Sequence, residues 1–173
     1  MFSCVPFRTL PDKVLAGMQW AGDRLQPNTL YSTMDDDIVI HVPNLVSYLK
    51  ENFLKPDLCQ LPRHGEEKSW GRPCLEDLPL LCVYSYQARD TPTRFWFSKW
   101  YISYQEFSGR QWPAYCRGGM YIAPVKMIHS LFQISRRMEY LFLADVWITG
   151  FMRRKLEMGD SNIVVGYRCS DFK

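Results

Sequence analysis

The stretch Met34-Asp35-Asp36-Asp37-Ile38-Val39-Ile40 sets three consecutive carboxylates between the apolar-rich segment 29–34 and a second apolar run. Carboxylate oxygens are the ligands that Mg²⁺ and Mn²⁺ prefer, and a cation held there can bind a diphosphate. The stretch therefore makes a nucleotide or nucleotide-sugar site the first hypothesis. The alternative is an acidic turn between two strands, because Asp tolerates turn geometry and is common in turns.

The segments on either side of the aspartates predict a helix, a strand and a second helix. Apolar residues recur at helical spacing over about 11–24, which predicts a helix there. Residues 30–34 predict a short buried strand with the aspartates at its C-terminal end, where ligands of open α/β sheets bind. Pro43 is expected to open the second helix, which ends before Pro56.

The second half of the chain predicts further strands and helices. A long surface loop is expected over 57–79, where Pro, Gly and charged residues gather. Strands are expected at 80–86, 120–123 and 163–167, and an aromatic strand pair or ribbon at 95–104.

Two further helices are expected near the C-terminal end. Pro124 is suited to open one of them. Asp145 stands where the N-cap of the other would be, and Gly159 is suited to close it. The face of the first helix is expected to consist of Val125, Ile128, Leu131 and Phe132.

Composition narrows the class of protein. With 173 residues, 47% of them apolar and 23% charged, the chain fits one globular domain. The net charge of +3 is too small, and the basic residues too scattered, to indicate nucleic-acid binding. The sequence contains neither GxGxxG nor GxxxxGK[ST], so an unrelated nucleotide-binding class has little support. Its first residues lack the basic segment and the apolar stretch of a signal peptide, and no window approaches the 18 apolar residues of a membrane span.

The six cysteines occur at irregular spacing without a CxxC pair, which argues against a zinc site. One to three disulfides in an oxidising compartment are plausible, and a reducing compartment stays open. The aromatic share is 15%. Exposed aromatic rings can form platforms for sugars or bases, but core packing is the commoner role, and it is expected for Trp100, Tyr101 and Trp112.

Several separated blocks together resemble the β-1,3-galactosyltransferase family, which also contains β-1,3-N-acetylglucosaminyltransferases and the more distant Fringe enzymes. The resemblance covers roughly residues 7–160 and rests on order and spacing, because each block alone is weak. The blocks are Lys13-Val14-Leu15-Ala16-Gly17-Met18-Gln19-Trp20, Asp35-Asp36-Asp37-Ile38-Val39, Ser98-Lys99-Trp100-Tyr101-Ile102-Ser103, Trp112-Pro113-Ala114-Tyr115-Cys116-Arg117-Gly118-Gly119-Met120-Tyr121 and Ala144-Asp145-Val146-Trp147-Ile148-Thr149-Gly150.

The resemblance implies an α/β, GT-A-like fold, with a Rossmann-like mixed sheet and flanking helices. It also implies a DxD-type motif that binds Mn²⁺ and the diphosphate of a UDP-sugar donor. Asp35 and Asp37 match the metal-binding ends of that motif, and Asp36 between them is expected to face the nucleotide ribose. The chemistry agrees, because a bound cation offsets charge that accumulates on the UDP leaving group.

The resemblance also implies a general base at Asp145 for an inverting transfer onto a glycan of a glycoprotein or glycolipid. A base is needed because an acceptor hydroxyl is a poor nucleophile until its proton is removed. A helix N-terminus would keep Asp145 ionised but lower its basicity; an ordinary N-cap is the alternative role. Gly118 and Gly119 are expected to border the bound sugars or to shape a tight strand entry. Cys116 matches a family cysteine, so it is either disulfide-bonded or a buried free thiol.

Three departures from the family pattern shape the expectation. The strand and helix that help form the uridine pocket, and the signal anchor, are not matched here, so we expect a single, partial transferase domain over 1–173. Ala144 replaces an acidic residue, and no histidine follows Asp145 as a further metal ligand. His41 is closer to the aspartates, but a helix-entry role is the commoner one. The resemblance implies the Golgi membrane, reached through a segment outside this chain. The alternative to an enzyme is a non-catalytic paralogue that acts as a binding or scaffold protein.

Overall fold

A computed structural model describes residues 7–52, 78–86 and 90–165. In this part of the chain, four strands form one mixed sheet in the order β1-β3-β2-β4. β1 and β2 run antiparallel to β3, and β4 runs parallel to β2. The strands are β1 (Leu30–Met34), β2 (Leu80–Tyr86), β3 (Tyr115–Pro124) and β4 (Ile163–Val165).

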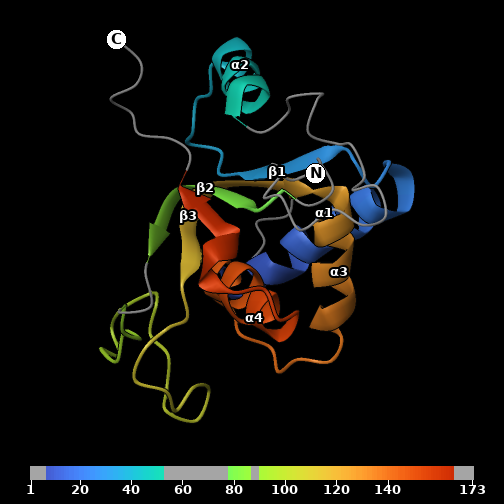
Figure 1. The fold of residues 1–173 in the computed structure, drawn as a ribbon. Coiled ribbons are helices and arrows are strands. Elements are labelled where there is room, and N and C mark those ends of the chain that lie inside the picture. The colour runs from blue at the N-terminus through green and yellow to red at the C-terminus, as the bar shows by residue number, and fades with distance from the viewer. Residues whose placement is uncertain (1–6, 53–77, 87–89, 166–173) are drawn as a thin grey trace, which may run out of the picture.

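Helices cover both faces of this sheet (Figure 1). One face packs against the first and third α-helices and a π-helix, and the other packs against the second α-helix. The α-helices are α1 (Leu10–Arg24), α2 (Val42–Asn52), α3 (Val125–Ser135) and α4 (Arg153–Lys155), the π-helix is η4 (Asp145–Met152), and short 3₁₀ turns are η1 (Phe7–Thr9) and η5 (Asp160–Asn162).

The alternation of β3 explains how the sheet has two buried faces. Tyr121 and Ala123 belong to the larger core, with α1, α3 and η4. Met120 and Ile122 point to the opposite face and pack with Leu49 of α2. Successive side chains of a strand point to opposite faces, so an apolar run places residues in both layers. The expected α/β fold with flanking helices and a mixed sheet is thus present in the described residues.

β1 has the predicted bounds but not the predicted burial. Its residues are half-buried or exposed, because in the described part of the chain it pairs only with β3 and lies at the edge of the sheet. Residues 35–38 then form a turn that is closed by a 3.3 Å hydrogen bond from Ile38 N to Asp35 O. The second apolar run, 38–40, forms no strand.

The helices predicted at 11–24 and after Pro43 are confirmed as α1 and α2. α2 is described to Asn52, and nearly all of the loop expected at 57–79 lies outside the described residues. The helix expected after Pro124 is confirmed as α3, whose residues Val125, Ile128 and Leu131 are buried. β2 matches its predicted bounds, β3 begins five residues earlier than expected, and the end expected for β4 lies beyond Val165.

The strand pair predicted at 95–104 is wrong. Residues 90–112 form turns and irregular loop, organised around the guanidinium group of Arg94. Its Nη1 donates to Ile102 O at 2.8 Å, and its Nη2 donates to Phe107 O at 2.7 Å and to Gly109 O at 2.9 Å. These carbonyl groups therefore find a side-chain donor in place of a neighbouring strand.

The predicted ends of the last long helix also need correction. Ala144 occupies the N-cap position, and Asp145 is the first residue of η4. The helix ends before Gly159, with Leu156 as the C-cap. Glu157, at φ 60°, takes the left-handed conformation that glycine was expected to supply. None of the described helices is long and apolar enough to cross a membrane.

Candidate functional site

Asp35 is fixed to the middle of β3. The register of β1 on β3 pairs Met34 with Met120, and the next residue extends the pairing by one step. Asp35 N donates to Gly119 O at 2.7 Å, and Gly119 N donates to the Asp35 carboxylate at 3.0 Å. The first aspartate of the acidic stretch is therefore held against β3 by its backbone and by its side chain.

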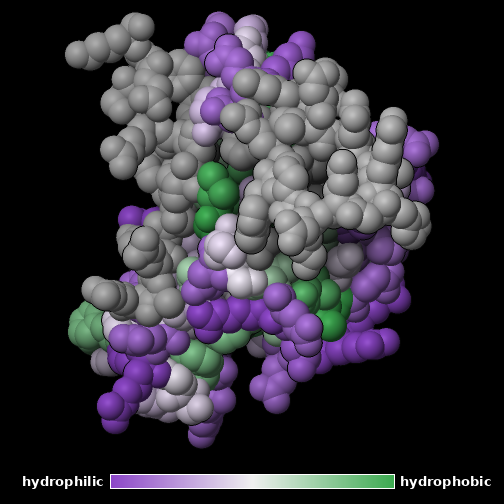
Figure 2. All heavy atoms as spheres, in the orientation of Figure 1, coloured by the Kyte–Doolittle hydropathy of each residue, from purple (hydrophilic) through white to green (hydrophobic). Residues whose placement is uncertain are grey.

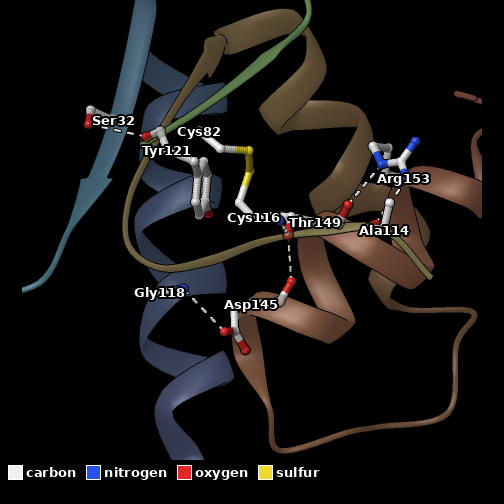
Figure 3. Close-up of a disulfide and its surroundings, with 9 residues drawn as sticks. All are labelled: Ser32, Cys82, Ala114, Cys116, Gly118, Tyr121, Asp145, Thr149 and Arg153. Carbon is white, nitrogen blue, oxygen red and sulfur yellow. Dashed lines mark hydrogen bonds between the residues drawn. A yellow bond between two sulfur atoms is a disulfide. The ribbon is translucent and has the colours of Figure 1, made fainter. Parts of the chain in front are cut away.

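Asp145 reaches the same point of β3 from the other side of the fold. Gly118 N donates to the Asp145 carboxylate at 3.3 Å, as Figure 3 shows. The other carboxylate oxygen accepts a 2.9 Å hydrogen bond from Val146 N. Asp35 and Asp145, which are far apart in the sequence, are thus hydrogen-bonded to adjacent glycines.

A buried threonine fixes the backbone of Asp145. Thr149 is fully buried, and its hydroxyl donates to Asp145 O at 2.5 Å while it accepts from Cys116 N at 2.9 Å. The first turn of η4 is therefore tied to β3 at Cys116 as well as at Gly118 (Figure 3).

The pKa of Asp145 is raised above that of an ordinary aspartate. Desolvation by burial is the largest cause, the amide hydrogen bonds from Val146 and Gly118 oppose it, and the charge of Asp35 raises it further. The direction is opposite to the helix-terminus effect expected from the sequence, because burial outweighs the donated hydrogen bonds. A carboxylate with a raised pKa is a stronger base once ionised, as a general base requires.

Asp36 and Asp37 lie exposed in the turn that follows Asp35. The described residues contain no group of three or more His, Cys, Asp or Glu side chains that could hold a metal ion. Mg²⁺-type sites commonly use only one or two carboxylates together with phosphate oxygens of the substrate. Asp35 and Asp37 offer carboxylates of the kind that such a site uses. His41 is not part of it: its Nδ1 accepts a 3.3 Å hydrogen bond from Asn44 N at the entry to α2.

Positions 118 and 119 differ in whether the backbone there requires glycine. Gly119 has φ 87°, and a Cβ there would lie 2.7 Å from Ile38 Cδ1. A Cβ at Gly118 would meet only the Asp35 carboxylate, at 3.8 Å. The backbone of β3 therefore requires glycine at 119, inside the strand and not at the entry that was expected, whereas the side of Gly118 toward the carboxylates is open.

A stability difference follows for the two glycines. Gly119→Ala is expected to lower the free energy of unfolding by about 1–2 kcal/mol, because a Cβ in the left-handed region is strained. Gly118→Ala is the matched control and is expected to change it by less than about 1 kcal/mol. Urea unfolding of both variants measures the difference; equal losses would contradict it.

Two features of the site were not predicted from the sequence, namely the burial of Arg153 and the disulfide partner of Cys116. Arg153 is fully buried, although charged residues are seldom buried. It donates to Thr149 O at 2.9 Å, to Ala114 O at 3.0 Å, to Met158 O at 2.7 Å and to Gly159 O, and it pairs with Asp160 at 2.8 Å. This side chain joins the end of η4 to the start of β3. Nothing in its local pattern, Met152-Arg153-Arg154-Lys155, separates it from a solvated basic run.

The disulfide partner of Cys116 is the second feature. Cys116 is bonded to Cys82 of β2 with the Cα atoms 5.3 Å apart, which decides between the two alternatives for Cys116. Trp112 is buried as expected, whereas Trp100 is 51% exposed, so the core role expected for Trp100 is wrong. Tyr101 is half-buried.

Comparisons with known proteins agree with the resemblance. Residues 80–163 match the family model for galactosyltransferases. β-1,3-Galactosyltransferase brn of Drosophila melanogaster is 26% identical over 79% of this chain and 35% of its own length. β-1,3-Galactosyltransferase 4 of Rattus norvegicus is 25% identical over 91% of this chain and 44% of its own length. The human lactosylceramide 1,3-N-acetyl-β-D-glucosaminyltransferase is 26% identical over 82% of this chain and 32% of its own length.

The chain spans less than half of the length of these relatives. The region that matches the family model, residues 80–163, contains β2, β3, α3 and η4. It therefore includes Gly118, Gly119 and Asp145. Residues 80–163 are thus similar to the galactosyltransferase family, and most of the chain is similar in sequence to β-1,3-galactosyltransferases and lactosylceramide 1,3-N-acetylglucosaminyltransferases.

Proposed function

We propose that this chain is the catalytic part of an inverting glycosyltransferase that moves galactose or an N-acetylhexosamine from a UDP-sugar to a 3-hydroxyl of an acceptor glycan on protein or lipid. The observation that carries the proposal is the convergence of Asp35 and Asp145 on Gly118 and Gly119. The relatives support the class of reaction, since all three are named as 1,3-transferases of a sugar.

Each residue has a separate role in the proposal. Asp35 and Asp37 would hold Mn²⁺, which offsets negative charge on the departing diphosphate when it is bound. Asp36 is assigned to the nucleotide ribose. Gly118 and Gly119 let a sugar approach the backbone of β3, because neither has a side chain.

Asp145 takes the proton of the acceptor hydroxyl as that oxygen attacks the anomeric carbon. Its carboxylate is held by Gly118 N and its backbone by Thr149, so the base is fixed relative to β3. Positioning of this kind lowers the entropic cost of attack. Burial raises its pKa, which improves the match between base and reaction. The compartment proposed is the Golgi, where the Cys82–Cys116 disulfide would persist.

The metal role predicts an effect on nucleotide binding. Asp37→Ala is expected to weaken Mn²⁺-dependent binding of UDP by about 10–100-fold, since losing one metal ligand lowers affinity at least as much as losing a supporting contact. Titration calorimetry of UDP with and without Mn²⁺ measures it. Asp23→Asn, an exposed carboxylate on α1, is the matched control and should bind UDP as the unmodified chain does. Unchanged binding in Asp37→Ala would contradict the metal role.

A second candidate is a non-catalytic protein that acts as a binding or scaffold partner. The observation in its favour is that the described residues gather no three-ligand metal group, together with Ala144 in place of an acidic residue. The same calorimetry separates the two functions. A chain that binds no UDP in the presence of Mn²⁺ supports the second candidate.

A further inference from the structure

The helical segment formed by η4 and α4 bonds to β3 and the residue before it with one side chain in every four residues. The bonded pairs are Asp145 with Gly118, Thr149 with Cys116, and Arg153 with Ala114. Successive partners lie two residues earlier along the chain, so the helical segment and the strand run beside each other in opposite directions (Figure 3). The distance between them therefore decides where the Asp145 carboxylate lies relative to Gly118.

Gly150 lies where η4 and the start of β3 come close together. A Cβ at this position would lie 2.9 Å from Pro113 Cγ and 3.3 Å from Tyr115 Cβ. Non-bonded carbon atoms prefer separations of about 3.5–4.0 Å, so an added methyl group would push the two segments apart by roughly 0.5–1 Å. Among the described glycines, Gly119 alone has a positive φ, so space rather than backbone conformation requires glycine at 150.

The contact at Gly150 is part of the protein interior. Gly150, Pro113 and Tyr115 are buried, and the ring of Phe151, the next residue, meets the buried Trp112 edge to face with the centroids 6.0 Å apart. By contrast, hydrophilic residues make up most of the described surface on the face that Figure 2 shows. Protein interiors are close-packed and transmit strain, so the neighbours of Gly150 leave a methyl group little room.

The bonds of Asp35 do not pass through this contact. Asp35 N donates to Gly119 O, and Gly119 N donates to the Asp35 carboxylate. Both bonds join the end of β1 to β3 without a residue of η4. A larger spacing between η4 and β3 is therefore expected to displace Asp145 and to leave Asp35 where it is.

We propose that Gly150 is a positioning residue, whose missing side chain sets the distance between η4 and β3 that brings the Asp145 carboxylate to Gly118. It acts through the backbone of η4 and through the bond between Thr149 and Cys116. Its effect on sugar transfer rests on the proposed function, whereas the spacing itself can be tested without any activity.

A pair of variants tests the effect on transfer. Gly150→Ala is expected to lower kcat by about 10–100-fold, because a displacement of about 1 Å can cost that much even when it arises away from the chemistry. Binding of UDP with Mn²⁺ should be nearly unchanged, since Asp35 stays in place. Pro113→Ala removes the Cγ atom that the new methyl group would meet. The double variant Gly150→Ala, Pro113→Ala is therefore expected to recover most of the lost transfer from a radiolabelled UDP-sugar.

Amide hydrogen exchange measures the spacing independently of activity. In Gly150→Ala, the amide of Cys116 is expected to exchange faster than in the unmodified chain, because its 2.9 Å bond to the Thr149 hydroxyl is stretched. The amide of Gly119, which is bonded to Asp35, should exchange as before. The double variant should restore slow exchange at Cys116.

Gly22→Ala is the matched control. A Cβ at this position would lie 2.6 Å from His129 Nδ1, where α1 meets α3. This variant therefore crowds a different helix contact, and exchange at Cys116 should not change. Equally fast exchange at Cys116 in Gly22→Ala and in Gly150→Ala would show general loosening and would overturn the proposal.

Two further results would also overturn it: unchanged exchange at Cys116 in Gly150→Ala, or a double variant that recovers neither slow exchange nor transfer. Near-ultraviolet circular dichroism shows whether each variant is folded. If Gly150→Ala does not fold, the double variant decides, because a folded one with slow exchange at Cys116 supports the proposal and an unfolded one contradicts it. An unmodified chain that transfers no sugar would count against the proposed function alone.

Discussion

Asp145→Asn is expected to reduce sugar transfer by about 10²–10⁴-fold, the usual contribution of a positioned general base. Asn has nearly the same shape and can keep the hydrogen bond from Gly118 N through its one carbonyl oxygen, but it gives up the one from Val146 N and cannot take a proton. The effect is expected in kcat, with donor affinity nearly unchanged. Radiolabelled transfer from the UDP-sugar measures it, and Asp23→Asn on the exposed surface of α1 serves as the control.

For the same variant we expect a loss of activity without a loss of stability. Burial raises the pKa of Asp145. The stability that this group contributes to the folded state is therefore fully present below the ordinary aspartate pKa, and it is lost as pH rises through the raised value. At neutral pH the ionised group therefore costs stability, and Asp145→Asn should unfold at the same or a higher urea concentration. In the unmodified chain, activity should fall as acid protonates Asp145. A variant that is both inactive and less stable would indicate a merely structural role.

Arg153→Met is expected to lower the free energy of unfolding by about 3–5 kcal/mol, a large part of the stability of a domain this size. Met fills most of the space but leaves the carbonyls of Ala114, Thr149, Met158 and Gly159 without their donor. Each buried acceptor left unsatisfied costs about 1–3 kcal/mol, less where water enters.

The neighbouring residue supplies a control for this prediction. Arg154 also pairs with Asp160, at 3.2 Å, but its side chain is 50% exposed. Exposed ion pairs contribute little, so Arg154→Met should cost less than about 1 kcal/mol. Urea unfolding of the two variants gives the comparison. Similar midpoints for both would show that the buried hydrogen bonds of Arg153 are not what stabilises the end of η4.

Local patterns in the sequence predicted most of the elements that position the site. The helical spacing before Leu25, the strand at 30–34 and the start of α3 at Pro124 depend on neighbouring residues, and each is present. The grouping of Asp35 with Asp145 was predicted from the order of the blocks that resemble the family. No local pattern links the residue after β1 with the first residue of η4. Their metal-binding and catalytic roles stay predictions.

The failures arose where tertiary contacts override local preference. Residues 95–104 have the aromatic content of a strand, but they form successive turns, with hydrogen bonds from Ser98 N to Phe95 O and from Tyr101 N to Ser98 O, and Ile102 O accepts from Arg94. β1 was expected to be buried because it is apolar, yet burial depends on how many strands flank it. The role of Arg153 depends on carbonyls at 114, 149, 158 and 159, which only the fold brings together.

The edge position of β1 has a consequence for how the two carboxylates stay together. Asp145 is tied to β3, which is itself crosslinked to β2, whereas Asp35 is carried by a short outer strand. Transient local opening of that strand would separate the pair while the rest of the domain stays native. Amide hydrogen exchange should accordingly be faster at Thr33, whose position in the ladder bonds it to β3, than at Ile122. Under the function proposed above, a bound nucleotide would select the assembled geometry by stabilising the closed population.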